Sequence, residues 1–433
     1  MKKVLFFIAS CWLCFACKHE KQVTHPGDYN VFLKPEFLQK QLSRINEEIN
    51  FWQKRLDADT GSFGNMLELG YHFLHPFKTT GSIRDLKLAD SLFLRSSQKL
   101  NETEPNIFYT LSQNAITQHR FKNAYKYCVQ GEKQNGSPYV ARLLSFDALM
   151  ELGMYKQALA SIEQLRDKTS FDYLIRKAKY EDHAGRPEAA IKLMEQAMEK
   201  CDSRKNSGAY KWLRSNLADM YGHANRIKKA YEGYLDVLKV DSANLYCLKG
   251  IAWIVYSHEH NTKEAKRILN FILTQTNMPD VYLLLAEIED FEGNHAMKQK
   301  YINLFLQGVN NKEYGAMYNK YLVHLYADEL NEPQKAIDIA KEEIASRPTP
   351  ETYSWLAWSK YKNAEPAEAM EIIKNNVEGF TYEPATLMKV ATIYAANGES
   401  GKAKQIFKKC LKSSFELGPV ATKSIEDAID AME

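Results

Sequence analysis

Two pairs of histidines have a spacing that could hold a metal ion. His258 and His260 form a His-x-His pair, and His72 and His75 lie three residues apart, which would place both on one face of a helix. No third ligand is evident near the first pair, and the second fits the polar end of a helix. The sequence therefore predicts solvated polar residues at both places and no metal site.

The sequence also lacks the compact motifs of common enzymes. It has no Gly-x-x-x-x-Gly-Lys phosphate loop, no Gly-x-Gly-x-x-Gly turn, no Gly-x-Ser-x-Gly nucleophile turn and no His-Glu-x-x-His helix. The acidic pairs at 47–48 and 342–343 stand among lysines, as on a solvated helix face. We therefore expect a protein that is not an enzyme and that uses no cofactor.

The amino-acid composition excludes several further classes of protein. The low counts of Gly (20) and Pro (13) in 433 residues argue against disorder and against a turn-rich β protein. A mean hydropathy of −0.45 excludes a protein with several membrane spans. The net charge of +3 is too small to favour nucleic acid as a partner.

The first seventeen residues have the pattern of an export signal. Lys2 and Lys3 precede an apolar run over residues 4–16, which is too short to span a bilayer as a helix. A small residue followed by Cys17 resembles the end of a bacterial lipoprotein signal. That resemblance implies cleavage before Cys17 and acylation of its thiol.

Two alternatives to Cys17 remain open. Residues 8–11 match the local lipoprotein motif better and end at Cys11, but cleavage there would leave an apolar mature N-terminus. The apolar run could also stay uncleaved as an anchor. We favour Cys17 because the polar residues 18–34 that follow it fit a tether. Of the other cysteines, Cys128, Cys201, Cys247 and Cys410 are far apart and are interpreted as buried apolar residues.

The strongest signal is an internal repeat. A small residue recurs roughly every 35 residues, and an aromatic or aliphatic residue follows it four positions later on the same helical face. The series is Ala89, Ala124, Ala158, Ala190, Ala230, Ala265, Lys298, Ala336, Ala369 and Ala403. Lys298 breaks the small-residue rule and marks a degenerate unit. A Gly or Asn before the small residue would end the preceding helix.

This repeat resembles the tetratricopeptide repeat (TPR) family, over residues 63–413. The resemblance implies an all-α, right-handed superhelical solenoid of nine to ten helical hairpins. Residues 35–62 are predicted to form an N-terminal capping helix and residues 414–433 a C-terminal one. We expect a long connection over residues 75–82 and extra turns at 202–207 and 308–314.

The resemblance also implies a ligand groove, lined by the first helix of each hairpin. Carried over residue by residue, the groove positions are Asn106, Tyr109, Gln113, Asp147, Lys179, Trp212 and Asp219. A mixed polar and aromatic lining suits a protein or peptide segment with Trp and Tyr as anchors. It lacks the several Asn, Lys and Arg residues needed to hold acidic chaperone tails.

These observations favour a membrane-anchored scaffold or adaptor lipoprotein that binds an envelope protein or peptide in its groove. The alternative is a glycan-binding or small-molecule-binding lipoprotein of nutrient uptake, although the repeat spacing leaves no long insertion to build such a site. We expect the cell envelope of a Gram-negative bacterium, with the lipid in the outer membrane and the protein facing the periplasm.

Overall fold

The computed structural model describes residues 22–201, 207–276 and 278–432, and the regular elements in these ranges are all helical. The chain begins with α1 (Pro26–Tyr29), η1 (Asn30–Phe32) and α2 (Pro35–Ala58). Ten hairpins follow: α3 (Phe63–Thr80) with α4 (Ile83–Lys99), α5 (Pro105–Thr117) with α6 (Phe121–Lys133), α7 (Pro138–Glu151) with α8 (Tyr155–Glu163), α9 (Phe171–His183) with α10 (Pro187–Cys201), α11 (Gly208–His223) with α12 (Ile227–Val240), α13 (Leu245–Trp253) with α14 (Thr262–Gln275), α15 (Asp280–Phe291) with α16 (His295–Val309), α17 (Asn319–Asp328) with α18 (Pro333–Ser346), α19 (Pro350–Lys362) with α20 (Pro366–Asn376), and α21 (Pro384–Ala396) with α22 (Ser400–Cys410). A π-helical turn, η3 (Ile254–His258), extends α13, and the short η4 (Lys312–Tyr314) lies between α16 and α17. The chain closes with η5 (Leu411–Ser413) and α23 (Ser414–Asp430). The predicted all-α array of hairpins is confirmed.

The repeating small residue explains how each hairpin packs. The nine alanines of the series lie on the second helices and are at most 1% exposed, so the two helices of a hairpin approach closely there. Lys298 stands at the same position of α16. Its ammonium instead forms ion pairs with Asp290 (3.1 Å) and Glu329 (2.8 Å), which compensate for the missing apolar contact.

Every first helix ends at a residue with a left-handed backbone conformation. Those residues are Gly81, His119, Gly153, Gly185, Asn225, His260, Gly293, Asn331, Ala364 and Gly398. Gly and Asn tolerate positive φ best, which is why they mark most of these turns in the sequence. His260 of the His-x-His pair is one of these turn residues and is exposed, whereas His258 is half-buried.

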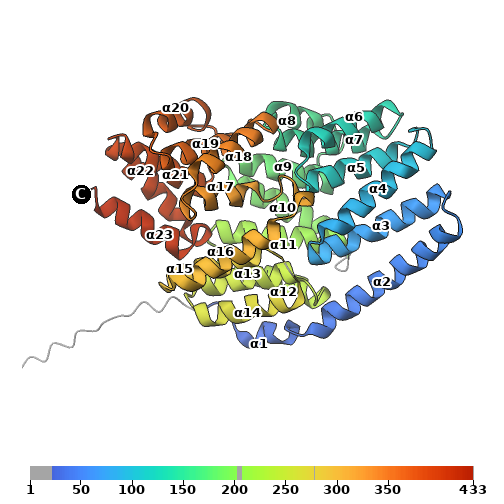
Figure 1. The fold of residues 1–433 in the computed structure, drawn as a ribbon, viewed down its shortest axis with the longest axis horizontal. Helices are drawn as coiled ribbons and strands as arrows, with labels where there is room; N and C mark the ends of the chain where they lie inside the picture. The colour runs from blue at the N-terminus through green and yellow to red at the C-terminus, as the bar shows by residue number, and fades with distance from the viewer. Residues whose placement is uncertain (1–21, 202–206, 277, 433) are drawn as a thin grey trace, which may run out of the picture.

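The array curves with the first helices on its inside. At both ends of the array successive first helices contact each other directly, as α5 contacts α7 and α19 contacts α21. Figure 1 shows the chain bending round until the segment between α16 and α17 lies beside α4, and η4 does contact α4.

One turn of this coil touches the next. The Thr276 hydroxyl donates to the Thr80 carbonyl (3.0 Å), and the Tyr382 ring packs directly on Gly185. These partners lie 196 and 197 residues apart (276 minus 80, and 382 minus 185), which is close to six repeats of about 34 residues. The solenoid is therefore wound tightly enough to close on itself.

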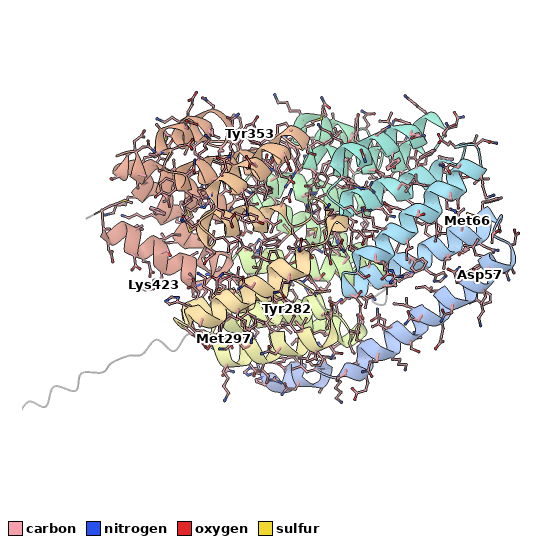
Figure 2. The ribbon with its side chains drawn as sticks, viewed as in Figure 1. Asp57, Met66, Tyr282, Met297, Tyr353 and Lys423 are labelled. Atoms are coloured by element: carbon pink, nitrogen blue, oxygen red, sulfur yellow. The ribbon has the colours of Figure 1, made fainter. Side chains whose placement is uncertain are left out.

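Two local predictions are wrong. The expected long connection over residues 75–82 is helical, because α3 continues through Pro76 to Thr80 and only Gly81 (φ 74°) ends it. The polar tether expected over residues 18–34 is folded from residue 23 onward, since Thr24 and Tyr29 are fully buried against the array. At the N-terminal end of the array, Figure 2 shows Asp57 of α2 close to Met66 of α3, and Leu56 and Met66 share a core cluster there.

Further expectations from the sequence concern the extra turns, membrane-spanning helices and the cysteines. Residues 202–206, where one extra turn is expected, lie outside the described residues, and η4 occupies the other expected position. Among the described helices, none is both long and apolar enough to cross a membrane. Cys128, Cys201, Cys247 and Cys410 are buried free thiols, as predicted.

Candidate functional site

The candidate site is the inner wall, which we define as the surface of the first helices α3 to α21 that faces the inside of the coil. The predicted groove residues are spread over four of these helices. Asn106, Tyr109 and Gln113 lie on α5, Asp147 on α7, Lys179 on α9, and Trp212 and Asp219 on α11. Cys17, the predicted lipidation site, lies outside the described residues.

Hydrogen bonds and ion pairs between side chains join neighbouring first helices along the inner wall. Between α7 and α9, Arg176 Nη2 donates to Asp147 Oδ2 (2.7 Å) and Lys179 Nζ to Glu151 Oε1 (2.8 Å). Partially exposed pairs of this kind contribute at most about 1 kcal/mol each. Asp147 and Lys179 therefore already have partners within the chain, and a ligand would have to compete with these partners.

Asp219 is also engaged within the wall. Its two carboxylate oxygens accept hydrogen bonds from the hydroxyls of Tyr234, on the second helix of the same hairpin, and Tyr246, on the next first helix. Burial raises the pKa of the Asp219 carboxyl, although both hydroxyl donors oppose that change. Asp219 thus joins α11 to α12 and α13.

Tyr109 is the one predicted groove residue that the structure contradicts as an accessible anchor. Its ring is only 4% exposed, and its hydroxyl donates to the Ser137 carbonyl (3.2 Å). The ring fits into space left by Gly131 and Gly136, where a Cβ atom would meet it at 2.6 and 2.4 Å. The residue packs between hairpins because those two glycines let it.

Four predicted residues keep their side chains accessible, and one of them, Lys179, is the residue already paired with Glu151. Asn106 and Gln113 are exposed on α5, about two helical turns apart, and Trp212 is 48% exposed on α11. Tyr246 on α13 is exposed to the same extent as Trp212, and sequence reasoning missed it. It could have been found, because it holds the second position of its helix, a position that the family uses for ligands.

Part of the inner wall is already covered by the C-terminal helix. The Phe415 side chain packs on Gly222 of α11 and edge-on against Trp253 of α13. The Phe415 carbonyl accepts from Trp253 Nε1 (3.1 Å) and from the Ser257 hydroxyl (2.7 Å). The π-helical turn η3 places Ser257 for this contact, and such turns often occur at functional sites. Sequence reasoning missed the contact because nothing in residues 414–433 indicates where the helix packs.

Carboxyl groups inside the coil have raised pKa values. Burial raises the pKa of Asp182, Glu383 and Glu416, and the nearby carboxylates reinforce the effect on the two glutamates. Lys320 and His223 face the same space and oppose it, with His223 Nδ1 4.0 Å from Glu416. The inside of the coil therefore gathers several charged groups, although the Asp182 and Glu383 side chains themselves stay exposed.

Glu287 of α15 shows the same effect beside α23. Burial raises the pKa of its carboxyl to about 7, against a weak donation from the Tyr256 hydroxyl (3.4 Å). Its carboxylate lies against Gly418, where a Cβ atom would come within 2.6 Å of Oε1. Gly418 has φ 81° and forms the kink that brings α23 inward.

A half-buried amine lies farther along the wall. Lys389 Nζ is 2.7 Å from His324 Nδ1, and the Lys389 ammonium stacks over the Trp358 ring. Burial, with help from Lys320 and Lys362, lowers the pKa of Lys389 to about 7, and burial also lowers the pKa of His324. Near neutral pH the pair therefore carries less positive charge than its residue types suggest.

A cavity of about 370 Å³ lies between α10, α11 and α12. Its lining includes Tyr210, Tyr221, Arg214, Glu195 and Asp236. Tyr221 donates to Glu195 (2.6 Å), and Arg214 pairs with Asp236 (2.8 Å), so its polar groups bind one another. Within the described residues, no group of three His, Cys, Asp or Glu side chains is placed to hold a metal ion.

Comparisons with known proteins give distant similarities in fold only. No protein-family model matches the chain, and no curated protein matches its sequence. A tetratricopeptide repeat protein from Parabacteroides merdae is similar at 16% identity, with 61% of this chain and 99% of that chain covered and a TM-score of 0.34. The TPR domain of P58(IPK) is similar at 14% identity, with 94% and 97% covered and a TM-score of 0.28. The ten hairpins, with their small buried residues and left-handed turns, show that the described chain is an all-α solenoid of helical hairpins.

Proposed function

We propose that this protein is a helical-repeat scaffold that binds a segment of a partner protein on its inner wall. The observation that carries the proposal is the contact with α23, because the inner wall there already holds a peptide segment of this same chain. The Phe415 ring packs against Gly222, which has no Cβ atom to block it. The side chains of Trp253 and Ser257 both donate hydrogen bonds to the Phe415 carbonyl. The same chemistry would bind any segment that offers an aromatic residue and a free carbonyl.

Exposed groups on the rest of the wall extend this mode of binding. Trp212 and Tyr246 offer aromatic surface, and Asn106 and Gln113 offer amide donors and acceptors. Aromatic residues of this kind dominate the energetics of protein interfaces. Such a scaffold acts by binding and holding, and no catalytic step is assigned to it.

We further propose that the scaffold is anchored by lipid on Cys17 in the envelope of a Gram-negative bacterium, in the outer membrane and facing the periplasm. The basic residues, the short apolar run and the following cysteine support this location. Metabolic labelling with a palmitate analogue, compared between Cys17→Ser and Cys11→Ser, tests it. Loss of label in the first variant alone supports Cys17, and an equal label in both contradicts it.

The binding proposal is tested by crosslinking in cells, affinity purification and mass spectrometry. Trp212→Ala should reduce recovery of the partner about thirtyfold if Trp212 is a hot spot worth about 2 kcal/mol. Phe51→Ala is the matched control, because Phe51 is equally exposed (50%) but lies on α2, outside the inner wall. Equal loss in both variants, or no specific protein, would contradict the proposal. In that case a glycan and small-molecule screen would test the nutrient-uptake alternative.

A further inference from the structure

The described N-terminal segment is fixed to the outer side of one hairpin. The Val23 and Thr24 amides donate to Glu259 Oε1 (2.8 and 2.6 Å), and the Thr24 hydroxyl donates to Glu259 Oε2 (2.9 Å). Glu259 directly follows the π-helical turn η3, so this side chain holds the segment against the α13–α14 hairpin.

The next turn of chain strengthens this attachment. The Tyr29 hydroxyl donates to Glu264 Oε1 of α14 (2.6 Å), and the Tyr29 ring is fully buried. Arg267, also on α14, bonds to Asn30 and to Glu264. The Tyr231 hydroxyl of α12 donates to Asp28 (3.1 Å). We call this set of contacts the N-terminal latch.

The latch limits how far the array can lie from a lipid on Cys17. Six Cα steps separate Cys17 from Val23, which is a reach of at most about 22 Å for extended chain. A free tether through residue 34 would reach about 60 Å. The folded segment thus removes most of the freedom that the sequence suggested.

We propose that the face formed by α1, α12 and α14 lies against the bilayer surface that holds the lipid. This inference rests on the proposed lipid anchor at Cys17. These elements carry exposed Lys263 on α14 and exposed Asp28 and Glu232 on α1 and α12, so the face offers both charge signs to the charged headgroups of phospholipids. Lys34 and Val31 (50% exposed), which follow α1, are exposed as well. Figure 1 places α1 and α14 at one edge of the molecule and α8 and α20 at the opposite edge.

The orientation has a consequence for binding. The hairpin whose outer side carries the latch is also the one whose inner side, through Trp253 and Ser257, receives Phe415 of α23. A partner segment that takes the place of α23 is therefore held within one hairpin's thickness of the membrane-facing surface.

Energy transfer between protein and lipid tests the inference. The acylated full chain, with its lipid on Cys17 verified by mass spectrometry, is reconstituted in phosphatidylethanolamine and phosphatidylglycerol vesicles that contain an acceptor lipid. A donor dye is attached at Lys263→Cys on α14 or at Gln157→Cys on α8. Both positions are exposed, and the four native cysteines in the described residues are buried. We expect strong transfer from position 263 and weak transfer from position 157.

Two further variants separate the latch from other causes. A Gly/Ser insertion of about twelve residues between Lys21 and Gln22 leaves the latch intact but lengthens the reach, and it should abolish the difference between the two positions. Glu259→Ala should do the same by freeing the segment, while Glu371→Ala, an exposed change on α20 at the opposite edge, should not. Equal transfer from both dyes with lipid present overturns the orientation and leaves the anchor standing. Absence of lipid on Cys17 overturns the anchor itself.

Discussion

Two segments far apart in sequence pack on the same hairpin from opposite sides. On the outside, the N-terminal latch joins backbone amides and hydroxyls to the carboxylates of Glu259 and Glu264. On the inside, α23 buries Phe415 and offers a neutral carbonyl to Trp253 and Ser257. The π-helical turn η3 lies between the two contacts, since Ser257 belongs to it and Glu259 follows it.

The two sides of the hairpin change the pKa of a glutamate carboxyl group in opposite directions. Outside, hydrogen bonding to Arg267 lowers the pKa of Glu264, so that carboxylate stays ionised to low pH. Inside, burial raises the pKa of Glu287 to about 7 and raises that of Glu416 as well. The same residue type is therefore a stable ionic partner on one side and a group that titrates near neutrality on the other.

The largest effect is expected from removing the inner aromatic contact. Phe415→Ala should cost about 3 kcal/mol of unfolding free energy, because it empties the space between Gly222 and Trp253. Urea unfolding measures the change. Phe380→Ala is the control, because Phe380 is 58% exposed and its loss should cost less than about 0.5 kcal/mol. Equal costs would mean that α23 contributes little to the fold.

The second effect concerns pH on the inner side. The folded pKa of Glu287, about 7, lies above its ordinary value of 4.5, so its contribution is fully present below pH 4.5 and is lost as pH rises through 7. Glu287→Gln should remove this loss and make the variant more stable than the parent by about 2 to 3 kcal/mol at pH 8, with little difference at pH 4.5. Thermal unfolding at several pH values measures it, and a parallel shift at all pH values would contradict it.

The outer side should show the opposite trend. Because the folded pKa of Glu264 is lowered, its contribution is present above pH 4.5 and is lost as pH falls through the folded pKa. Glu264→Gln should therefore cost about 1 kcal/mol at pH 7 and less at pH 3. If both glutamine variants changed stability in the same direction with pH, the contrast between the two sides would be wrong.

The repeat, and with it the fold class, could be predicted because hairpin packing is local. A small residue such as Ala230 and a turn residue such as Asn225 act within one hairpin, so their spacing is visible in the sequence. The exposure of Gln113 and Trp212 has the same local cause, because the position in a first helix decides which way a side chain faces, and their role in binding stays a prediction.

What could not be predicted are the contacts between distant turns of the coil. Whether Tyr382 packs on Gly185 or α23 enters the coil depends on the small rotation that each hairpin adds to the last, and those rotations accumulate over nearly six repeats. Tyr109 is a smaller case of the same kind. Its burial depends on two glycines, Gly131 and Gly136, that lie on the neighbouring second helix and in the turn after it.

The smallest expected effect sharpens the comparison between the two sides. Thr24→Val and Ser257→Ala each remove one hydroxyl donor while another donor to the same residue remains. The Thr24 hydroxyl donates to an ionised carboxylate, whereas the Ser257 hydroxyl donates to a neutral carbonyl, and charge-assisted hydrogen bonds are the stronger kind.

We therefore expect about 1 kcal/mol for Thr24→Val and about 0.5 kcal/mol for Ser257→Ala by urea unfolding at pH 7. Added salt should reduce the first cost more than the second, because screening weakens only the contact with a charge. The reverse order would mean that burial of the donor, rather than the charge of its acceptor, decides how strongly each segment is held.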